Sequence, residues 1–182
     1  VTYNDGQQVS SSKPLSVAGG PPIAMFSWAP TDPGEGQPVQ FTDQSVDQNP
    51  GGTIVAWAWV FGDGGSSSLQ HPAHTYADDG NYGVTLTVTN SYAQTASIAQ
   101  IVSVHNLPPT CNAGPDRQVR VGDPVTFTGQ AQDPGILDRL SYSWDFGDGG
   151  SAQGQIATHV FLTVGTYTVT LTVTDNAGDQ AT

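Results

Sequence analysis

Residues 144–174 read WDFGDGGSAQGQIATHVFLTVGTYTVTLTVT, and this stretch decides the fold. Its last eight residues, 167–174, alternate between large apolar side chains and threonine. A period of two places one set of side chains on a buried face and the other in solvent, and β-branched residues favour strands. Gly-Asp-Gly-Gly at 147–150 and the glycine at 165 are typical of tight turns, because glycine adopts positive φ at little steric cost. The stretch therefore predicts two strands and their turns, without a helix.

The same pattern occurs 85 residues earlier, where residues 59–89 read WVFGDGGSSSLQHPAHTYADDGNYGVTLTVT. Aligned without gaps, 18 of the 39 positions in 59–97 are identical to their counterparts in 144–182. Further apolar pairs at alternate positions mark strands in both copies. They are Trp57 and Trp59, Tyr142 and Trp144, Val39 and Phe41, and Val125 and Phe127. Two copies of one all-β domain are therefore predicted, each a β-sandwich of about seven short strands.

These residues carry a family resemblance. Trp-Asp-Phe-Gly-Asp-Gly, then His-x-Phe or His-x-Tyr, then Gly-x-Tyr-x-Val-x-Leu-x-Val is similar to the pattern of the PKD (polycystic kidney disease) domain. The first copy departs from it by having Val60 where Asp145 stands in the second. The resemblance implies tandem immunoglobulin-like β-sandwiches in a row, used outside the cell as spacer, adhesion or protein-contact modules of a prokaryotic surface or secreted protein.

A third, partial copy of the repeat stands at the amino terminus. Residues 1–22 align without gaps on residues 88–109, with Ser16-Val17 opposite Ser103-Val104 and a Pro-Pro pair at the end of each segment. The chain then ends before a counterpart of the strand near 98–104. We therefore divide it into a terminal strand and linker at 1–20, a first domain at 21–107, and a second domain at 108–182 that lacks its own last strand.

A sandwich that lacks a strand exposes a sheet edge, which is a template for pairing with another chain. The orphan amino-terminal strand is of the missing type, so we expect it to complete the second domain of a neighbouring subunit by strand addition. The contact residues would be Val9, Ser11, Leu15 and Val17. In the alternative, the 182 residues are a window of a continuous array, and the strand belongs to a preceding domain of the same chain.

The composition excludes several classes of protein. Sixteen Asp and Glu against four Lys and Arg give a net charge of −12, so nothing would neutralise nucleic-acid phosphates. No run of apolar residues is long enough to cross a bilayer, so no membrane insertion is expected. The sequence contains neither Gly-x-Ser-x-Gly nor His-Glu-x-x-His. We expect no catalytic residues, no required cofactor and an extracellular or cell-surface location.

Calcium is the strongest metal hypothesis. Asp133, Asp138 and Asp145 are close in sequence, and calcium takes six to eight oxygen ligands from carboxylates, carbonyls and water. The resemblance adds that some PKD domains bind calcium near the loop before the tryptophan strand. The alternative is that these aspartates cap their own turns. His74 and His159 recur at equivalent positions, but no second metal ligand recurs with them, so we expect both to bond to the turn backbone at the edge of the sandwich.

Trp28 has no aromatic counterpart, since Pro115 stands at the aligned position. It could stack on a sugar or a neighbouring subunit, or pack as a satellite of the core beneath a long loop. We predict a non-catalytic extracellular structural module, the repeating unit of a surface stalk or filament, associating head to tail. The alternative is an accessory carbohydrate- or protein-binding module of a secreted hydrolase or adhesin.

Overall fold

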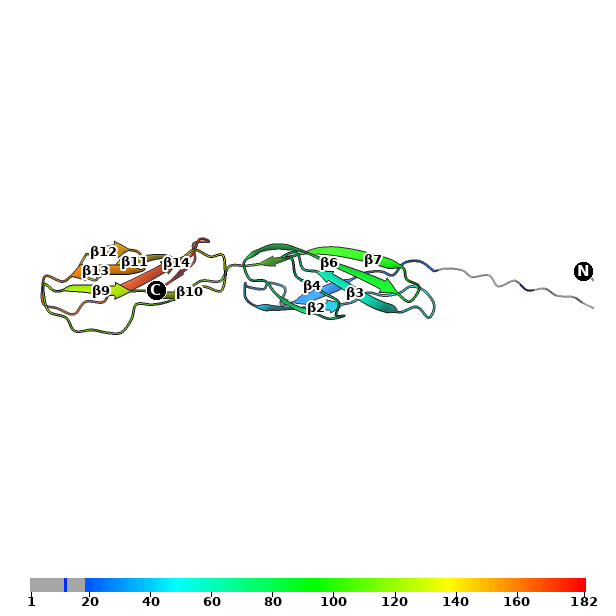
Figure 1. Cartoon of the computed structure of the whole chain (residues 1–182), viewed down its shortest axis with the longest axis horizontal. Coiled ribbons are helices and arrows are strands. Elements are labelled where there is room, and N and C mark those ends of the chain that lie inside the picture. Colours follow the sequence, from blue (N-terminus) through cyan, green and yellow to red (C-terminus); the bar gives the residue numbers. More distant parts are fainter. Residues whose placement is uncertain (1–11, 13–18) are drawn as a thin grey trace, which may run out of the picture.

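A computed structural model describes Ser12 and residues 19–182, and shows two β-domains placed end to end along one axis (Figure 1). The described residues form strands, turns and loops, and none of them forms an α-helix. They accordingly contain no helix with the length and hydropathy needed to span a membrane. The predicted terminal strand, with its contact residues Val9, Ser11, Leu15 and Val17, lies outside the described residues.

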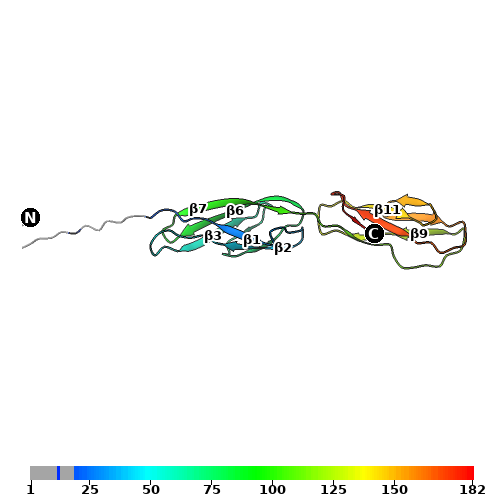
Figure 2. The same ribbon diagram turned by 180° about the vertical axis from the view of Figure 1, so that it is seen from behind.

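The first domain is a sandwich of two antiparallel sheets, as the alternating pattern predicts. One sheet has the order β1-β2-β5, and the other has the order β4-β3-β6-β7. The strands are β1 (Phe26–Ala29), β2 (Pro38–Asp43), β3 (Ile54–Val60), β4 (Ser66–Ser67), β5 (Ala73–Thr75), β6 (Gly80–Asn90) and β7 (Thr95–Val104). The long hairpin of β6 and β7 runs along the whole domain, as the view from behind shows (Figure 2).

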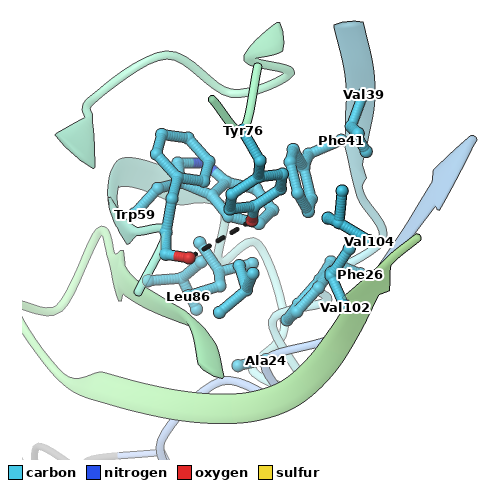
Figure 3. Close-up of a cluster of buried hydrophobic side chains, with 12 residues drawn as sticks. Ala24, Phe26, Val39, Phe41, Trp59, Tyr76, Leu86, Val102 and Val104 are labelled. Carbon is cyan, nitrogen blue, oxygen red and sulfur yellow. Dashed lines mark hydrogen bonds between the residues drawn. The ribbon is translucent and has the colours of Figure 1, made fainter. Parts of the chain in front are cut away.

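The core of the first domain lies between these sheets. Trp59, Phe61 and Phe41 are fully buried and lie ring against ring. Tyr76 also lies in this core, and its hydroxyl donates a 3.2 Å hydrogen bond to the Phe61 carbonyl (Figure 3). The sheet faces predicted from the period of two are therefore confirmed. Val102 and Val104 of β7 close one side of the core.

The second domain repeats this plan with shorter strands. Its four-stranded sheet has the order β12-β11-β14-β15, and two strand pairs, β8 with β10 and β9 with β13, stand opposite it. The strands are β8 (Thr110–Asn112), β9 (Pro124–Thr128), β10 (Gln130–Gln132), β11 (Ser141–Asp145), β12 (Ser151–Gln153), β13 (Ile156–Val160), β14 (Thr170–Thr174) and β15 (Gln180–Ala181).

One predicted strand is shorter than the sequence indicates. The alternation over 167–174 matches that of β6, but β14 begins only at Thr170. The physical reason is that a strand needs a paired neighbour along its length. β6 pairs with β7 at ten positions, whereas β14 pairs with β15 at only two. Residues 165–169 have the strand pattern without a partner ladder among the described residues.

The Gly-Asp-Gly-Gly turns lie close to the backbone of the neighbouring segment in their own sheet. Gly62 and Gly147 adopt φ of 92° and 75°, and a Cβ would collide with the backbone of Gly83 in β6 or of Thr168 just before β14, respectively. The aspartate of each turn accepts a hydrogen bond from the glycine amide two residues later. These aspartates therefore cap their own turns.

Candidate metal centre at the domain junction

The linker between the domains is held by one glutamate. Glu35 Oε1 accepts a 2.9 Å hydrogen bond from the backbone N–H of Leu107, and the Glu35 N–H donates to the His105 carbonyl at 3.1 Å. A β-bridge between Gly34 and His105 adds to this contact. The loop before β2 is thereby tied to the first residues after β7, and the Glu35 side chain is directed into the junction.

Carboxylates from both domains meet at this point. Carboxylate oxygens of Glu35, Asp133 and Asp138 lie within 4.8 Å of one another, and those of Glu35, Asp78 and Asp79 form a second such group. The two aspartates at 78 and 79 belong to the loop between β5 and β6, whereas Asp133 and Asp138 belong to the loop before β11. Glu35 is common to both groups, so it is the centre of the cluster, which we call the junction cluster.

The loop of the second domain is shaped to reach the first. The Gly135 N–H donates to Asp133 Oδ1 at 3.0 Å, and the Ile136 N–H donates across the junction to the Ala77 carbonyl at 3.1 Å. A Cβ at Gly135 would collide with Asp138 Oδ2 and with Glu35 Oε2. Glycine at 135 therefore leaves open the space on which these two carboxylates converge.

The oxygens that face this space have no hydrogen-bond partner. Glu35 is 1% exposed, and its Oε2 is buried without a donor. One carboxylate oxygen of each of three aspartates is also buried without a donor: Asp78 Oδ1, Asp133 Oδ2 and Asp138 Oδ2. Among the described residues, the ion pairs all involve histidines elsewhere, and none reaches the junction cluster. Buried carboxylate oxygens without partners carry a large desolvation cost, which a bound cation would offset.

The charges in the cluster alter each other's protonation. Burial raises the pKa of Glu35, and the neighbouring Asp133 and Asp78 raise it further. Burial, together with Asp133 and Glu35, raises the pKa of Asp138 to about 6. Both shifts have the direction expected for carboxylates crowded together without a counter-charge. A divalent cation would supply that charge.

The donor set fits calcium. Oxygen ligands at the meeting point of several loops match its preference for six to eight oxygens, whereas magnesium usually retains several waters and uses one or two carboxylates. Asn106 Oδ1 is a further buried oxygen without a partner in this linker. The arrangement brings oxygen donors together, and such a set is suited to holding a cation.

The predicted metal set is brought together in part. Asp133 and Asp138 join the junction cluster, but Asp145 does not. Asp145 is the last residue of β11, four residues beyond the loop end of that strand, or about 13 Å at 3.3 Å per residue. Its Oδ1 instead accepts a hydrogen bond from the Gly147 N–H at 2.9 Å, which is a turn cap.

Sequence reasoning missed Glu35 and did not connect Asp78 to Asp133. One signal was available. Glu35 is the chain's only glutamate, and Val121 occupies its place in the second copy. Asp78 and Asp79 are likewise replaced there, by Thr163 and Val164. All three carboxylates are thus absent from the second copy, as expected of residues that act together. That they meet the 133–138 loop of the second domain could be learned only from the tertiary structure.

The two recurring histidines have structural contacts. His74 Nε2 lies 2.7 Å from Asp63 Oδ2, and the imidazole is stacked on Phe61 with 4.1 Å between ring centroids. His159 repeats this arrangement with Asp148 and Phe146 at the same distances. Each histidine bonds to the aspartate of its Gly-Asp-Gly-Gly turn rather than to the turn backbone, and so links the turn to the neighbouring strand.

Trp28 is half-buried on β1 and packs against the core of the first domain, 6.0 Å from the Phe26 ring. Its indole N–H is buried without a partner. Trp28 therefore packs on the core of the first domain, and its stacking on a ligand stays a prediction.

The folds and the repeat define a class, the tandem immunoglobulin-like β-sandwiches of the PKD type. The family model described as PKD domain matches residues 20–104 and 106–182. The chain belongs to the PKD domain family, and it contains two PKD domains.

Curated relatives are much longer than this chain. The pre-pro-metalloprotease PrtV of Vibrio cholerae is 32% identical over 149 residues, which cover 79% of this chain but 15% of that protein. The microbial collagenase of Vibrio alginolyticus is 34% identical over 91 residues, covering 50% of this chain and 11% of the relative. Among solved structures, the PKD1 domain of Vibrio anguillarum Epp is 32% identical with a TM-score of 0.42, covering 47% of this chain and 94% of that one.

Proposed function

We propose that this chain is a non-catalytic extracellular module that acts as a stiff accessory spacer in a larger secreted protein. Its relatives include a pre-pro-metalloprotease and a collagenase, in which the matching segment is a small part of the whole. Collagen lies outside the cell, so a module shared with a collagenase suits an extracellular setting. In such proteins a pair of PKD domains would set the distance and the angle between the domains on either side of it.

The observation that carries the proposal is the junction cluster. Two domains joined by a short linker move relative to each other unless their interface is large or cross-linked. Here Glu35 and Asp78 of the first domain face Asp133 and Asp138 of the second, with buried oxygens unpaired. A calcium ion bound between them would fix the angle between the domains, whereas the metal-free carboxylates repel one another.

Calcium titration of the chelator-treated chain tests this proposal. We expect one calcium site by isothermal titration, a higher melting temperature, and a more extended and uniform particle by small-angle X-ray scattering. Magnesium at the same concentration serves as the control cation, and its effect should be smaller. A chain that shows no calcium heat and the same melting temperature in calcium and in chelator would contradict the cation-fixed spacer.

A second candidate function is the repeating unit of a surface stalk or filament. The end-to-end placement of the two domains favours it, because units arranged in this way build a rod when they are repeated (Figure 1). Electron microscopy of concentrated protein tests this function. Rods of many lengths would support it, and particles that all have the length of two domains would contradict it.

A further inference from the structure

The outer edge of β9 has no partner strand among the described residues. In the first domain, the equivalent strand β2 lies between β1 and β5, so both of its edges are paired. In the second domain, β9 pairs with β13 alone. A free edge of this kind presents backbone N–H and C=O groups that can pair with an added strand.

Residues within the second domain turn the chain away from this edge. The segment 113–116 aligns with β1, but it forms no strand. Gly114 adopts a φ of 93°, and its N–H donates a 2.8 Å hydrogen bond to Asn112 Oδ1. Residues 113–123 therefore leave the sheet as a loop, which stands away from β9 in both views (Figure 1, Figure 2).

One side chain takes the place of the absent strand. Arg117 Nη1 donates a 2.8 Å hydrogen bond to the Thr126 carbonyl on the free edge. The guanidinium carbon of Arg117 lies 5.2 Å from the centre of the Phe127 ring. In the first domain, Phe26 of β1 packs against the equivalent ring, that of Phe41. Arg117 thus covers with a flexible side chain what β1 covers with a strand.

A cavity of about 490 Å³ lies beside this edge, and its wall is basic. It is formed by residues 117–120 of the loop and by residues 123–126. Arg117 and Arg120 are two of the chain's four basic residues, and neither forms an ion pair among the described residues. With Asp123, the wall holds two positive charges against one negative, in a chain whose net charge is −12. Such a wall favours an anionic group.

We propose that β9 and this cavity bind an extended acidic segment of a partner protein by strand addition. The main chain of the segment would pair with the backbone of Thr126 and Thr128. An apolar side chain would replace Arg117 on the Phe127 ring. A carboxylate would then bind the released guanidinium together with that of Arg120, and such charged pairs are the strong hydrogen bonds that select an acidic partner.

The direction of the backbone groups follows from the equivalent strand of the first domain. The Phe41 N–H donates to the carbonyl of Pro72, just before β5. Successive residues of a strand direct their backbone groups to alternate sides, so Phe127 faces β13, whereas Thr126 and Thr128 face the open side. The hydrogen bond that the Thr126 carbonyl accepts from the loop agrees with this assignment.

Fluorescence anisotropy of a labelled peptide, titrated with the full chain, tests the inference. The probe has the sequence of residues 25–32, MFSWAPTD, because it contains the β1 strand and an aspartate close behind it. We expect saturable binding to the wild type and to Arg139→Gln, the matched charge control. Arg117→Gln with Arg120→Gln should bind about tenfold more weakly, because the ion pairs are lost. The peptide carrying Asp32→Asn should lose a similar factor on the wild type.

Two methylated peptides separate strand addition from simple attraction of charge. In β1, Ser27 and Ala29 lie opposite the positions equivalent to Thr128 and Thr126. Methyl groups on these two peptide nitrogens should abolish binding, whereas methyl groups on the nitrogens of residues 26 and 28 should leave most of it. Hydrogen exchange of the Thr126 and Thr128 amides should slow when the unmodified peptide binds.

Four outcomes would overturn the inference. They are no saturable binding to the wild type, equal binding of the two methylated peptides, equal affinity of the double arginine variant and its control, and slowed exchange in β14 in place of β9. Circular dichroism checks that the variants keep the β-sheet signal. None of these residues belongs to the junction cluster, so binding should be equal in calcium and in chelator, and the cation-fixed spacer stands or falls separately.

Discussion

Glu35 Oε1 accepts a hydrogen bond from the Leu107 N–H at 2.9 Å, so the chain's only glutamate fastens the first domain to the linker that leads to the second. Its other oxygen, Oε2, is buried without a donor and faces the aspartates of the second domain. One side chain therefore both fixes the linker and contributes to the candidate metal centre. The linker is held in place by the domain that precedes it.

Glu35→Gln separates these two roles. The amide oxygen still accepts from Leu107, but the negative charge is lost. We expect calcium affinity to fall on the order of tenfold, because carboxylate charge tunes such sites. In chelator, the variant should be more stable than the wild type by about 1 kcal/mol, because like-charge repulsion and desolvation are relieved. Titration calorimetry and urea unfolding measure the two effects, with the exposed Asp116→Asn as the charge control.

Acidification should weaken calcium binding. The pKa of Asp138 is raised to about 6, so this ligand takes up a proton before the exposed carboxylates do. Between about pH 7 and pH 5, calcium affinity should fall on the order of tenfold for this one group. The metal-free junction has the opposite dependence. A raised carboxyl pKa means that the folded state binds more protons than the unfolded state, so its stability rises as the pH falls through 6. A flat affinity profile would contradict this prediction.

Gly135→Ala should block the centre without removing a ligand. The added methyl group would collide with Asp138 Oδ2 and Glu35 Oε2. We expect calcium binding to be lost and the contact between the domains to loosen, measured by calorimetry and by small-angle X-ray scattering. Gly83→Ala is the matched control, because a Cβ at Gly83 meets nothing within 4 Å. Equal calcium affinity in the two variants would show that the space beside Gly135 is not where the cation binds.

Asp63→Asn should destabilise the first domain alone. Burial raises the pKa of Asp63, but hydrogen bonds from His74 and from the Gly65 amide outweigh it and hold the pKa below its usual value. Losing the charged acceptor should cost about 1 kcal/mol at neutral pH. A lowered pKa contributes stability above the unfolded value near 4, and this contribution is lost at more acidic pH. Hydrogen exchange should show faster exchange of the backbone amides of β6, whereas the exchange rates of the β14 amides in the second domain should be unchanged.

Much of the fold could be predicted from local patterns. The alternation that places Val84 and Leu86 inward is a property of a few neighbouring residues, so it needs no tertiary information. The extent of β14 could not be predicted in this way. Residues 165–169 have the same pattern as the start of β6, but a strand also requires a partner, and the chain's pattern does not say whether the partner is present.

The candidate metal centre was likewise predictable only in part. Asp133 and Asp138 were found because they lie five residues apart in an acidic loop. Asp145 was included for its nearness in sequence, but it lies at the far end of β11, about 13 Å from the residue at which that strand leaves the loop. Glu35 was missed because its partners are about a hundred residues distant and in another domain. Separation in sequence is a poor guide to separation in space, because strands extend the chain and the domain junction brings distant loops together.

The sequence by itself determined that this chain is two PKD-type sandwiches with acidic, cation-poor surfaces, because periodicity, turn glycines and the repeat are local signals. Only the tertiary structure decided which acids converge. The Leu107 linker and the loop at 133–138 bring the second domain against Glu35 and Asp78, and one oxygen of each of these two side chains is buried between the domains without a hydrogen-bond partner. Convergence of this kind depends on how two folded domains meet, which no single stretch of residues encodes.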